Sequence, residues 1–151
     1  MNDLCDKFGD KIAVLGFISN QFGHQSPGSE QDFVNILKHV RPGGGFVCRP
    51  QLTLFKKCEV NGADQLPLFK WLKDRQKIPF GPAGDSKGNG VDDNDAVTQG
   101  DKSVLWAPIS RSDVAWNFEK FLAAPSGKFV QRYSRYYKID AIGDDVAALL
   151  E

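Results

Sequence analysis

The chain has 151 residues, of which 41% are apolar and 11% aromatic, enough for one domain with a hydrophobic core. Its 19 basic and 19 acidic side chains cancel, which argues against a nucleic-acid or anionic-membrane partner, and no apolar stretch reaches the roughly 20 residues of a membrane span. The three cysteines lack CxxC or Cys/His spacing, which argues against a disulfide framework or a metal site and favours a reducing compartment such as the cytoplasm.

The first third of the chain predicts a helix followed by a buried strand. Residues 2–8 are expected to form a helix that ends at Gly9, with Cys5 as a small buried hydrophobe. Residues 12–17 form a nearly unbroken apolar run, typical of a strand buried on both faces. Polar residues follow directly, so this strand is expected to deliver a polar loop at its C-terminal end, where sites lie in open α/β sheets; the loop contains Ser19, Asn20, Gln21, His24 and Gln25.

The clearest helix in the sequence follows this loop. Ser29 is a plausible N-cap with Asp32 three residues later, and the apolar residues Phe33, Ile36, Leu37 and Val40 then follow with helical spacing. Pro42 and three glycines end the helix.

The remaining elements alternate between extended and helical patterns. Residues 52–60 are expected to include an extended segment, and Pro67 opens a helix with Leu68, Phe69 and Leu72 facing inward. Residues 76–102, rich in glycine and acidic residues, predict a long surface loop. Regular structure is expected again at residues 103–106, in a hairpin of residues 114–122 and 128–133, and in a closing helix with Ile142, Val146, Leu149 and Leu150 inward. This order predicts an α/β fold of the thioredoxin-like type, with a mixed central sheet flanked by helices.

Two polar clusters are candidates for chemistry: residues 20–23 after the first strand and residues 116–118 at the start of the hairpin. The side chains of Gln21, Trp116 and Asn117 carry uncharged N–H donors, which would stabilise an anion if they converge. Alternatively, Trp116 is a core residue, and Gln21 and Asn117 are solvated or cap a turn. Adjacent residues of a regular strand face opposite sides, so Trp116 and Asn117 share one site only if they precede the strand or bend it.

Four segments together resemble the glutathione peroxidase family: KIAVLGFISNQFGHQ (residues 11–25), VRPGGGF (residues 40–46), KCEVNGA (residues 57–63) and SDVAWNFEKFL (residues 112–122). The PGGGF loop is similar to that of the tetrameric cytosolic branch. The resemblance implies a thioredoxin-like fold and reduction of hydrogen peroxide or organic hydroperoxides with glutathione as part of the response to oxidative stress. It implies no cofactor, and a homotetramer in the cytoplasm.

The resemblance also implies roles for individual residues. Gln21, Trp116 and Asn117 correspond to the three residues that support the family's selenocysteine or cysteine nucleophile. Arg41, Arg132 and Arg135 match positions implicated in binding glutathione, whose two carboxylates suit planar guanidinium groups. Ser19, Gln131 and Tyr136 depart from the family's usual cysteine and arginines, which leaves open whether glutathione or thioredoxin is the preferred reductant.

In the family, the nucleophile lies at the end of a strand just before the helix that begins here at Met1. We therefore expect selenocysteine or cysteine, with the N-terminal strands, to lie upstream of Met1, and residues 1–151 alone to fold poorly and to lack turnover. A noncatalytic thioredoxin-fold protein with a binding or structural role is the alternative. A third reading makes Cys48 or Cys58 the peroxidatic thiol.

Overall fold

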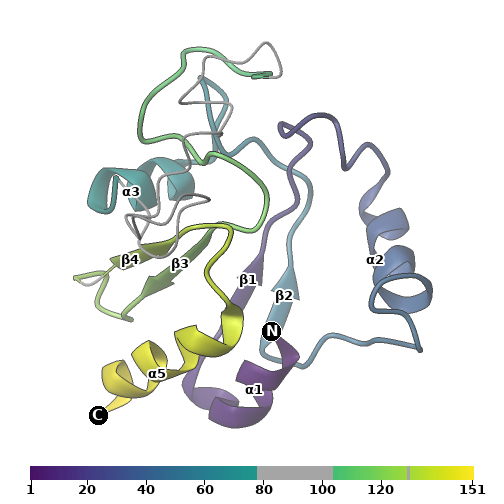
Figure 1. The fold of residues 1–151 in the computed structure, drawn as a ribbon, viewed down its shortest axis with the longest axis vertical. Coiled ribbons are helices and arrows are strands. Elements are labelled where there is room, and N and C mark those ends of the chain that lie inside the picture. The colour runs from purple at the N-terminus through teal and green to yellow at the C-terminus, as the bar shows by residue number, and fades with distance from the viewer. Residues whose placement is uncertain (78–103, 129) are drawn as a thin grey trace. The chain divides into compact units, whose positions relative to one another are not determined.

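The computed structural model describes residues 1–77, 104–128 and 130–151. Helices and short strands are both present, so the α/β class is confirmed (Figure 1). In chain order, the elements are α1 (Asn2–Phe8), the 3-10 turn η1 (Gly9–Lys11), β1 (Val14–Gly16), α2 (Glu30–His39), β2 (Leu52–Leu54), α3 (Pro67–Arg75), β3 (Lys120–Ala123), β4 (Val130–Tyr133) and α5 (Ile139–Leu150).

The strands form two small sheets within the described part of the chain. β1 pairs with β2 in parallel, with Val14 opposite Leu52, and β3 pairs with β4 antiparallel, with Lys120 opposite Tyr133. Parallel and antiparallel pairing are therefore both present, but each sheet has two strands and the described strands do not join into one mixed sheet.

The chain divides into two compact units. Unit 1 comprises Met1–Asn20 and His24–Cys58, and unit 2 comprises Gln21–Gly23 and Glu59–Glu151. The prediction of one domain over residues 1–151 stays a prediction. Among the described residues, no helix is long and apolar enough to span a membrane.

Unit 1 confirms the predicted first helix but not the predicted double burial of the first strand. α1 ends at Gly9, whose φ of 55° lies in the left-handed region that glycine adopts without strain, and Cys5 is buried as expected. Leu15 in the middle of β1 is 50% exposed, so the prediction of a strand buried on both faces is wrong at this residue. Thr53, the partner of Leu15 on β2, is exposed as well, so this face of the two-stranded sheet is open.

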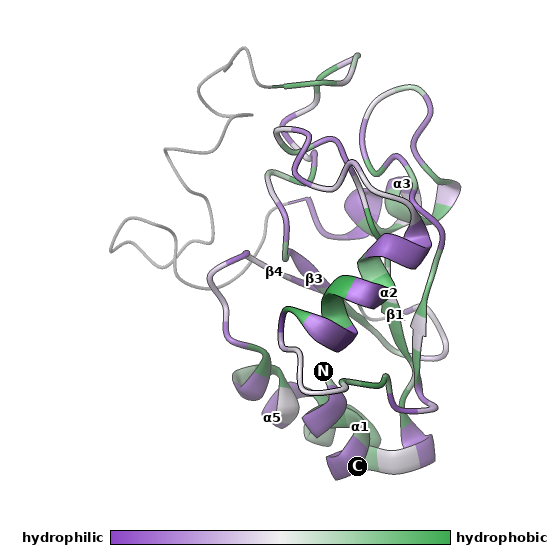
Figure 2. Cartoon of the chain, turned by 90° about the vertical axis from the view of Figure 1, so that its right-hand side faces the viewer, coloured by the Kyte–Doolittle hydropathy of each residue, from purple (hydrophilic) through white to green (hydrophobic). Residues whose placement is uncertain are grey.

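α2 begins as the sequence predicts. The Ser29 hydroxyl accepts a hydrogen bond from Asp32 N at 3.2 Å, and the Asp32 carboxylate accepts one from Ser29 N at 2.8 Å, which is a complete capping box. Figure 2 shows hydrophobic and hydrophilic residues side by side on this helix. The apolar face is not buried, however, because Ile36 and Val40 are exposed and no residue of α2 is buried.

α3 and α5 in unit 2 bury part of their predicted apolar faces. Pro67 opens α3, and Phe69 and Leu72 are buried, whereas Leu68 is exposed and Lys73 lies inside instead. Ile142 and Val146 of α5 are buried as predicted; Leu149 and Leu150, in the last turn of that helix, are exposed.

The predicted hairpin is confirmed and is shorter than expected, because β3 begins at Lys120. Val104 forms an isolated antiparallel bridge with Phe22, at the segment predicted to resume regular structure. Apart from Gln76 and Lys77, the surface loop predicted at residues 76–102 lies outside the described residues, as does Ser103.

Candidate functional site

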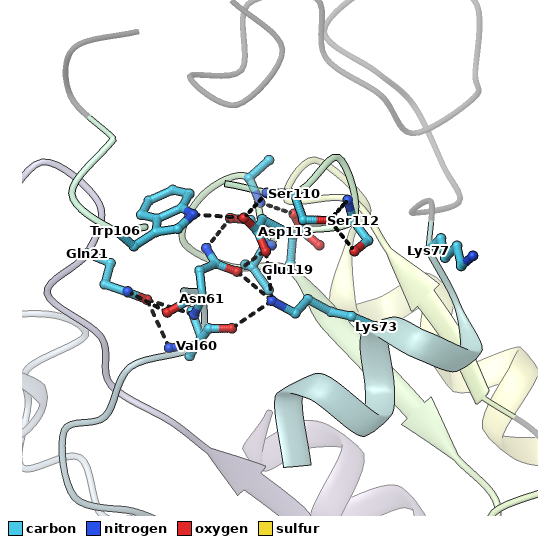
Figure 3. A network of polar contacts seen from close by, with 12 residues as sticks. Gln21, Val60, Asn61, Lys73, Lys77, Trp106, Ser110, Ser112, Asp113 and Glu119 are labelled. Atoms are coloured by element: carbon cyan, nitrogen blue, oxygen red, sulfur yellow. Dashed lines mark hydrogen bonds and ion pairs between the residues drawn. The ribbon is translucent and has the colours of Figure 1, made fainter. Parts of the chain in front are cut away.

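The Gln21 side chain is buried and is held by the main chain of the segment that precedes α3. Its Oε1 accepts hydrogen bonds from Val60 N at 2.9 Å and Asn61 N at 3.0 Å, and its Nε2 donates to Asn61 O at 3.0 Å (Figure 3). Because both ends of the amide are engaged, its orientation is fixed. Gln21 is therefore not the solvated side chain of the alternative reading.

Asn61 joins this segment to the one that carries Trp116 and Asn117. Its side chain is 1% exposed; its Nδ2 donates to Val114 O at 2.9 Å, and its Oδ1 accepts from Val114 N at 2.9 Å. Gly62 follows with a φ of 79°, and a Cβ there would lie 3.0 Å from Ala107 O, so glycine is required at this close approach.

Trp116 and Asn117 lie in a turn directly before β3. This placement meets the geometric condition for sharing a site, because the alternation of a regular strand does not apply to a turn. Trp116 is half-buried, and its ring centroid lies 5.9 Å from that of Phe22, the residue after Gln21. Phe22 also packs edge-on against Trp106, with centroids 5.8 Å apart. The contact between Phe22 and Trp116 thus links the two polar clusters within unit 2, which contains residues 21–23 of the first cluster and all of the second.

A buried ion pair supports these segments. Lys73 Nζ lies 2.9 Å from Asp113 Oδ1 and also donates to Asn61 Oδ1 at 3.0 Å and Val60 O at 3.1 Å. The other carboxylate oxygen of Asp113 accepts from Trp106 Nε1 and from Ser110 N, both at 2.8 Å. Burial lowers the pKa of Lys73, and the hydrogen bond to Asp113 opposes this shift.

Arg132 is also buried, with an exposed fraction of 1%. Its Nε pairs with Glu119 Oε2 at 2.6 Å, its Nη1 donates to Ser112 O at 2.8 Å and Lys77 O at 2.9 Å, and its Nη2 donates to Asp113 O at 2.9 Å. The second oxygen of Glu119 accepts from Ala115 N at 2.6 Å. Arg132 and Glu119 together therefore hold the segment that leads to Trp116.

Arg135 lies beside Trp116, whereas Arg41 belongs to the other unit. The Arg135 guanidinium carbon is 5.8 Å from the Trp116 ring centroid and 4.7 Å from that of Tyr136, within the range of cation–π contacts. Lys120 Nζ holds the turn that carries Arg135 by donating to the carbonyls of Ser134, Arg135 and Tyr137. Arg41 is exposed just after α2 in unit 1.

The three cysteines all lie in unit 1, and none forms a disulfide. Cys5 is buried, and Cys48 and Cys58 are half-buried. Within the described ranges, no group of three or more His, Cys, Asp or Glu side chains is placed to hold a metal ion.

Five supporting residues of this site were not predicted from the sequence: Asn61, Lys73, Trp106, Asp113 and Glu119. Asn61 and Asp113 lie inside two of the segments that resemble the peroxidase family. Lys73 stands four residues after the buried Phe69, a spacing that places both side chains on one face of a helix. This spacing was the sequence feature from which the burial of Lys73 could have been predicted. Trp106 had no comparable signal, because its partner Asp113 belongs to another turn.

Comparison with known proteins identifies the family. The family model described as glutathione peroxidase matches residues 1–73. Glutathione peroxidase 1 of Rattus norvegicus is 45% identical over 151 residues, which cover 99% of this chain and 69% of that protein. Glutathione peroxidase 2 of Homo sapiens is 42% identical, over 100% of this chain and 73% of that protein.

A solved structure described as the crystal structure of Trgpx in apo form aligns with 96% of this chain and 84% of that chain. Its sequence identity of 20% and TM-score of 0.43 are too low to support an assignment, which the sequence relatives carry instead. On the strength of those relatives, this chain belongs to the glutathione peroxidase family.

Proposed function

We propose that this protein reduces hydrogen peroxide or organic hydroperoxides with glutathione as the thiol donor, in the response to oxidative stress. The observation that carries the proposal is the 45% identity to glutathione peroxidase 1 of Rattus norvegicus over 99% of the chain. The structure adds that the segments of Gln21, Trp116 and Asn117 all belong to unit 2 and that Gln21 and Trp116 flank the same phenylalanine, Phe22.

In the proposed reaction, a selenolate or thiolate attacks the peroxide O–O bond. One peroxide oxygen is transferred to the nucleophile, which becomes a selenenic or sulfenic acid, and the other oxygen takes up a proton and leaves as an alcohol or water. One glutathione then displaces water to form a mixed conjugate, and a second glutathione releases the reduced nucleophile and glutathione disulfide. We propose that this nucleophile is a selenocysteine or a cysteine, as the resemblance to the family implies.

The proposed role of Gln21, Trp116 and Asn117 is to direct uncharged N–H donors at the anionic nucleophile and the leaving oxygen. Donors that are already oriented stabilise developing charge without reorganisation, and losing one typically costs on the order of 100-fold in rate. The three hydrogen bonds that fix the Gln21 amide supply such orientation.

Glutathione would be recognised through its carboxylates. Arg135 is the best placed of the three arginines, because its guanidinium lies beside Trp116. Arg41 is exposed in unit 1, and its contact with glutathione is proposed from the family resemblance alone. Direct contact between Arg132 and glutathione would require its buried guanidinium to leave Glu119, so we propose that Arg132 acts by holding the segment before Trp116.

Assembly and location are part of the same proposal. We place the protein in the cytoplasm as a homotetramer, because its PGGGF loop resembles that of the tetrameric cytosolic branch of the family.

The test is the hydroperoxide-dependent oxidation of glutathione by the full-length protein, with the peroxide step and the thiol step measured separately. Gln21→Ala and Trp116→Phe are expected to slow the peroxide step by about 100-fold. Trp71→Phe, at a tryptophan of α3 that contacts Arg75 instead of the site, is the matched control and should react like the wild type.

Three outcomes would contradict the proposal. A full-length protein without peroxide turnover would refute the activity, and full peroxide rates in both site variants would refute the donor roles. Sulfenic acid found by mass spectrometry at Cys48 or Cys58 in active protein would assign the role of nucleophile to that cysteine.

A further inference from the structure

We infer that Asn61 is a positioning residue of the peroxide-reducing site, one that orients Gln21 and the Trp116 turn without touching the substrate. The part of this inference that concerns catalysis rests on the proposed function. The part that concerns structure rests on hydrogen bonds within unit 2.

The main chain of Asn61 holds Gln21. Asn61 N donates to Gln21 Oε1 at 3.0 Å, and Asn61 O accepts from Gln21 Nε2 at 3.0 Å. These two bonds engage opposite ends of one amide group, so any displacement of the Asn61 backbone also displaces the Gln21 amide.

The side chain of Asn61 holds the other half of the site. It makes two hydrogen bonds with Val114, one to the backbone carbonyl and one from the backbone N–H, both at 2.9 Å. Val114 stands two residues before Trp116 and three before Asn117. Asn61 thus connects the Gln21 amide to the start of the Trp116 turn through four hydrogen bonds, two from its backbone and two from its side chain.

Lys73 determines which end of the Asn61 amide faces which partner. An ammonium group donates hydrogen bonds and accepts none, so the atom 3.0 Å from Lys73 Nζ must be the Asn61 oxygen. This oxygen, which faces Lys73 in Figure 3, also accepts from Val114 N, and the amide nitrogen therefore faces Val114 O. Asp113 balances the charge of Lys73, so the orientation is set inside a neutral buried cluster.

Only a side chain that has both a hydrogen-bond donor and an acceptor, and the length of asparagine, can bond the backbone carbonyl and the backbone N–H of Val114 together. Aspartate has the shape of asparagine but lacks the donor when ionised, and alanine lacks both groups. Asn61→Asp and Asn61→Ala therefore remove one and two of the bonds to Val114. Asn35, an exposed asparagine of α2 in unit 1, provides the matched control Asn35→Ala.

The experiment measures both half-reactions of the full-length enzyme for Asn61→Ala, Gln21→Ala and the double variant. We expect Asn61→Ala to slow the peroxide step by about 10-fold to 100-fold, the scale of a misplaced catalytic group, with the thiol step little changed. Because Asn61 acts partly through Gln21, the loss in the double variant should fall clearly below the product of the two single losses. A wild-type rate in Asn61→Ala, or losses that multiply fully, would overturn the inference.

A second measurement needs neither turnover nor a stable variant. In the wild-type protein with ¹⁵N-labelled side-chain amides, the NH₂ protons of Gln21 and Asn61 should exchange with solvent as slowly as backbone amides of β3 and β4. Rapid exchange at both would overturn the positioning role. Slow exchange in a protein without peroxide turnover would support the hydrogen bonding of Gln21 through Asn61 and would refute only the proposed peroxidase function. Failure of the positioning role and failure of the proposed function are therefore distinguishable. Asn61→Asp serves as the variant if Asn61→Ala does not fold.

Discussion

Two ion pairs in unit 2 join a buried basic side chain to a buried carboxylate: Lys73 with Asp113, and Arg132 with Glu119. Both pairs are surrounded by further hydrogen bonds to backbone groups, so the charges are satisfied even though water is excluded. Removing one partner of such a pair leaves an uncompensated buried charge, which is far more harmful than the loss of a surface pair.

Replacing Arg132 by methionine should therefore destabilise the protein by about 3 to 5 kcal/mol, because Glu119 and the carbonyls of Ser112 and Asp113 lose their donor. The free energy of unfolding from chemical denaturation is the measurement. Arg111→Met, at an exposed arginine of the same region, is the control and should change it little. An Arg132→Met protein as stable as this control would contradict the assigned role.

Tyr133 makes the free energy of unfolding depend on pH in the alkaline range. Burial raises the pKa of its hydroxyl above the usual value near 10, and the hydrogen bond to Asp145 at 2.7 Å adds to this shift. The folded protein keeps a proton that the unfolded chain loses, so the contribution of Tyr133 is fully present below about pH 10 and decreases above it.

The stability advantage of wild type over Tyr133→Phe should accordingly be constant from about pH 7 to 9 and shrink above about pH 10. Urea unfolding of both proteins across this range measures it. An advantage that stays constant up to pH 11 would show that Tyr133 ionises as readily in the folded protein as in the unfolded chain.

At the scale of the element, the stability of α2 depends more on the capping of its N-terminus than on the packing of its side chains. Its capping box is complete, while none of its residues is buried. Helical stability usually comes mainly from a packed apolar face, so a helix with an open face relies on its cap to an unusual degree. Three glycines with positive φ, Gly43, Gly44 and Gly45, follow and turn the chain away.

Ser29→Ala should lower the opening free energy of α2 by about 1 kcal/mol, because Asp32 N loses its acceptor. Native-state hydrogen exchange of the α2 amides measures this opening directly. Gln31→Ala removes an exposed side-chain contact to Asn35 on the same helix and should change the opening by only a few tenths of a kcal/mol. Equal effects of the two substitutions would argue against the cap.

At the scale of the whole molecule, the two units differ in how much they bury. The buried apolar residues of unit 1 in the described ranges are Cys5 and Ile18. Those of unit 2 are Phe22, Val60, Phe69, Leu72, Trp106, Val114, Tyr133, Ile142 and Val146. Since burial of apolar side chains is the main favourable contribution to folding, unit 2 has the larger reserve of stability.

Hydrogen exchange followed by mass spectrometry should therefore show faster exchange in α2 and β1 than in α3, β3 and β4. Regions with few buried contacts open locally at a lower free energy than the core does. Equal protection across both units would mean that they open as one cooperative body.

Much of the fold was predictable because its signals are local. The ends of α1, α2 and α3 follow from Gly9, Ser29 and Pro67, each of which acts on backbone groups a few residues away. The hairpin was predicted for the same reason, since a short turn joins its strands. The pairing of Gln21 with the Asn61 backbone was not predictable, because 40 residues separate the partners.

The sequence by itself determined where most helices begin and end, the α/β class and the two polar clusters, because capping, helical period and turn residues act over one or two turns of chain. Tertiary structure alone decided that Lys73 and Arg132 lie inside and Leu15 outside. An ion pair or an open sheet face depends on what the fold brings alongside, and the hydrogen-bond partners of the Arg132 side chain lie 13 to 56 residues away. The physical reason is that burial is a property of neighbours in space, which local sequence does not specify.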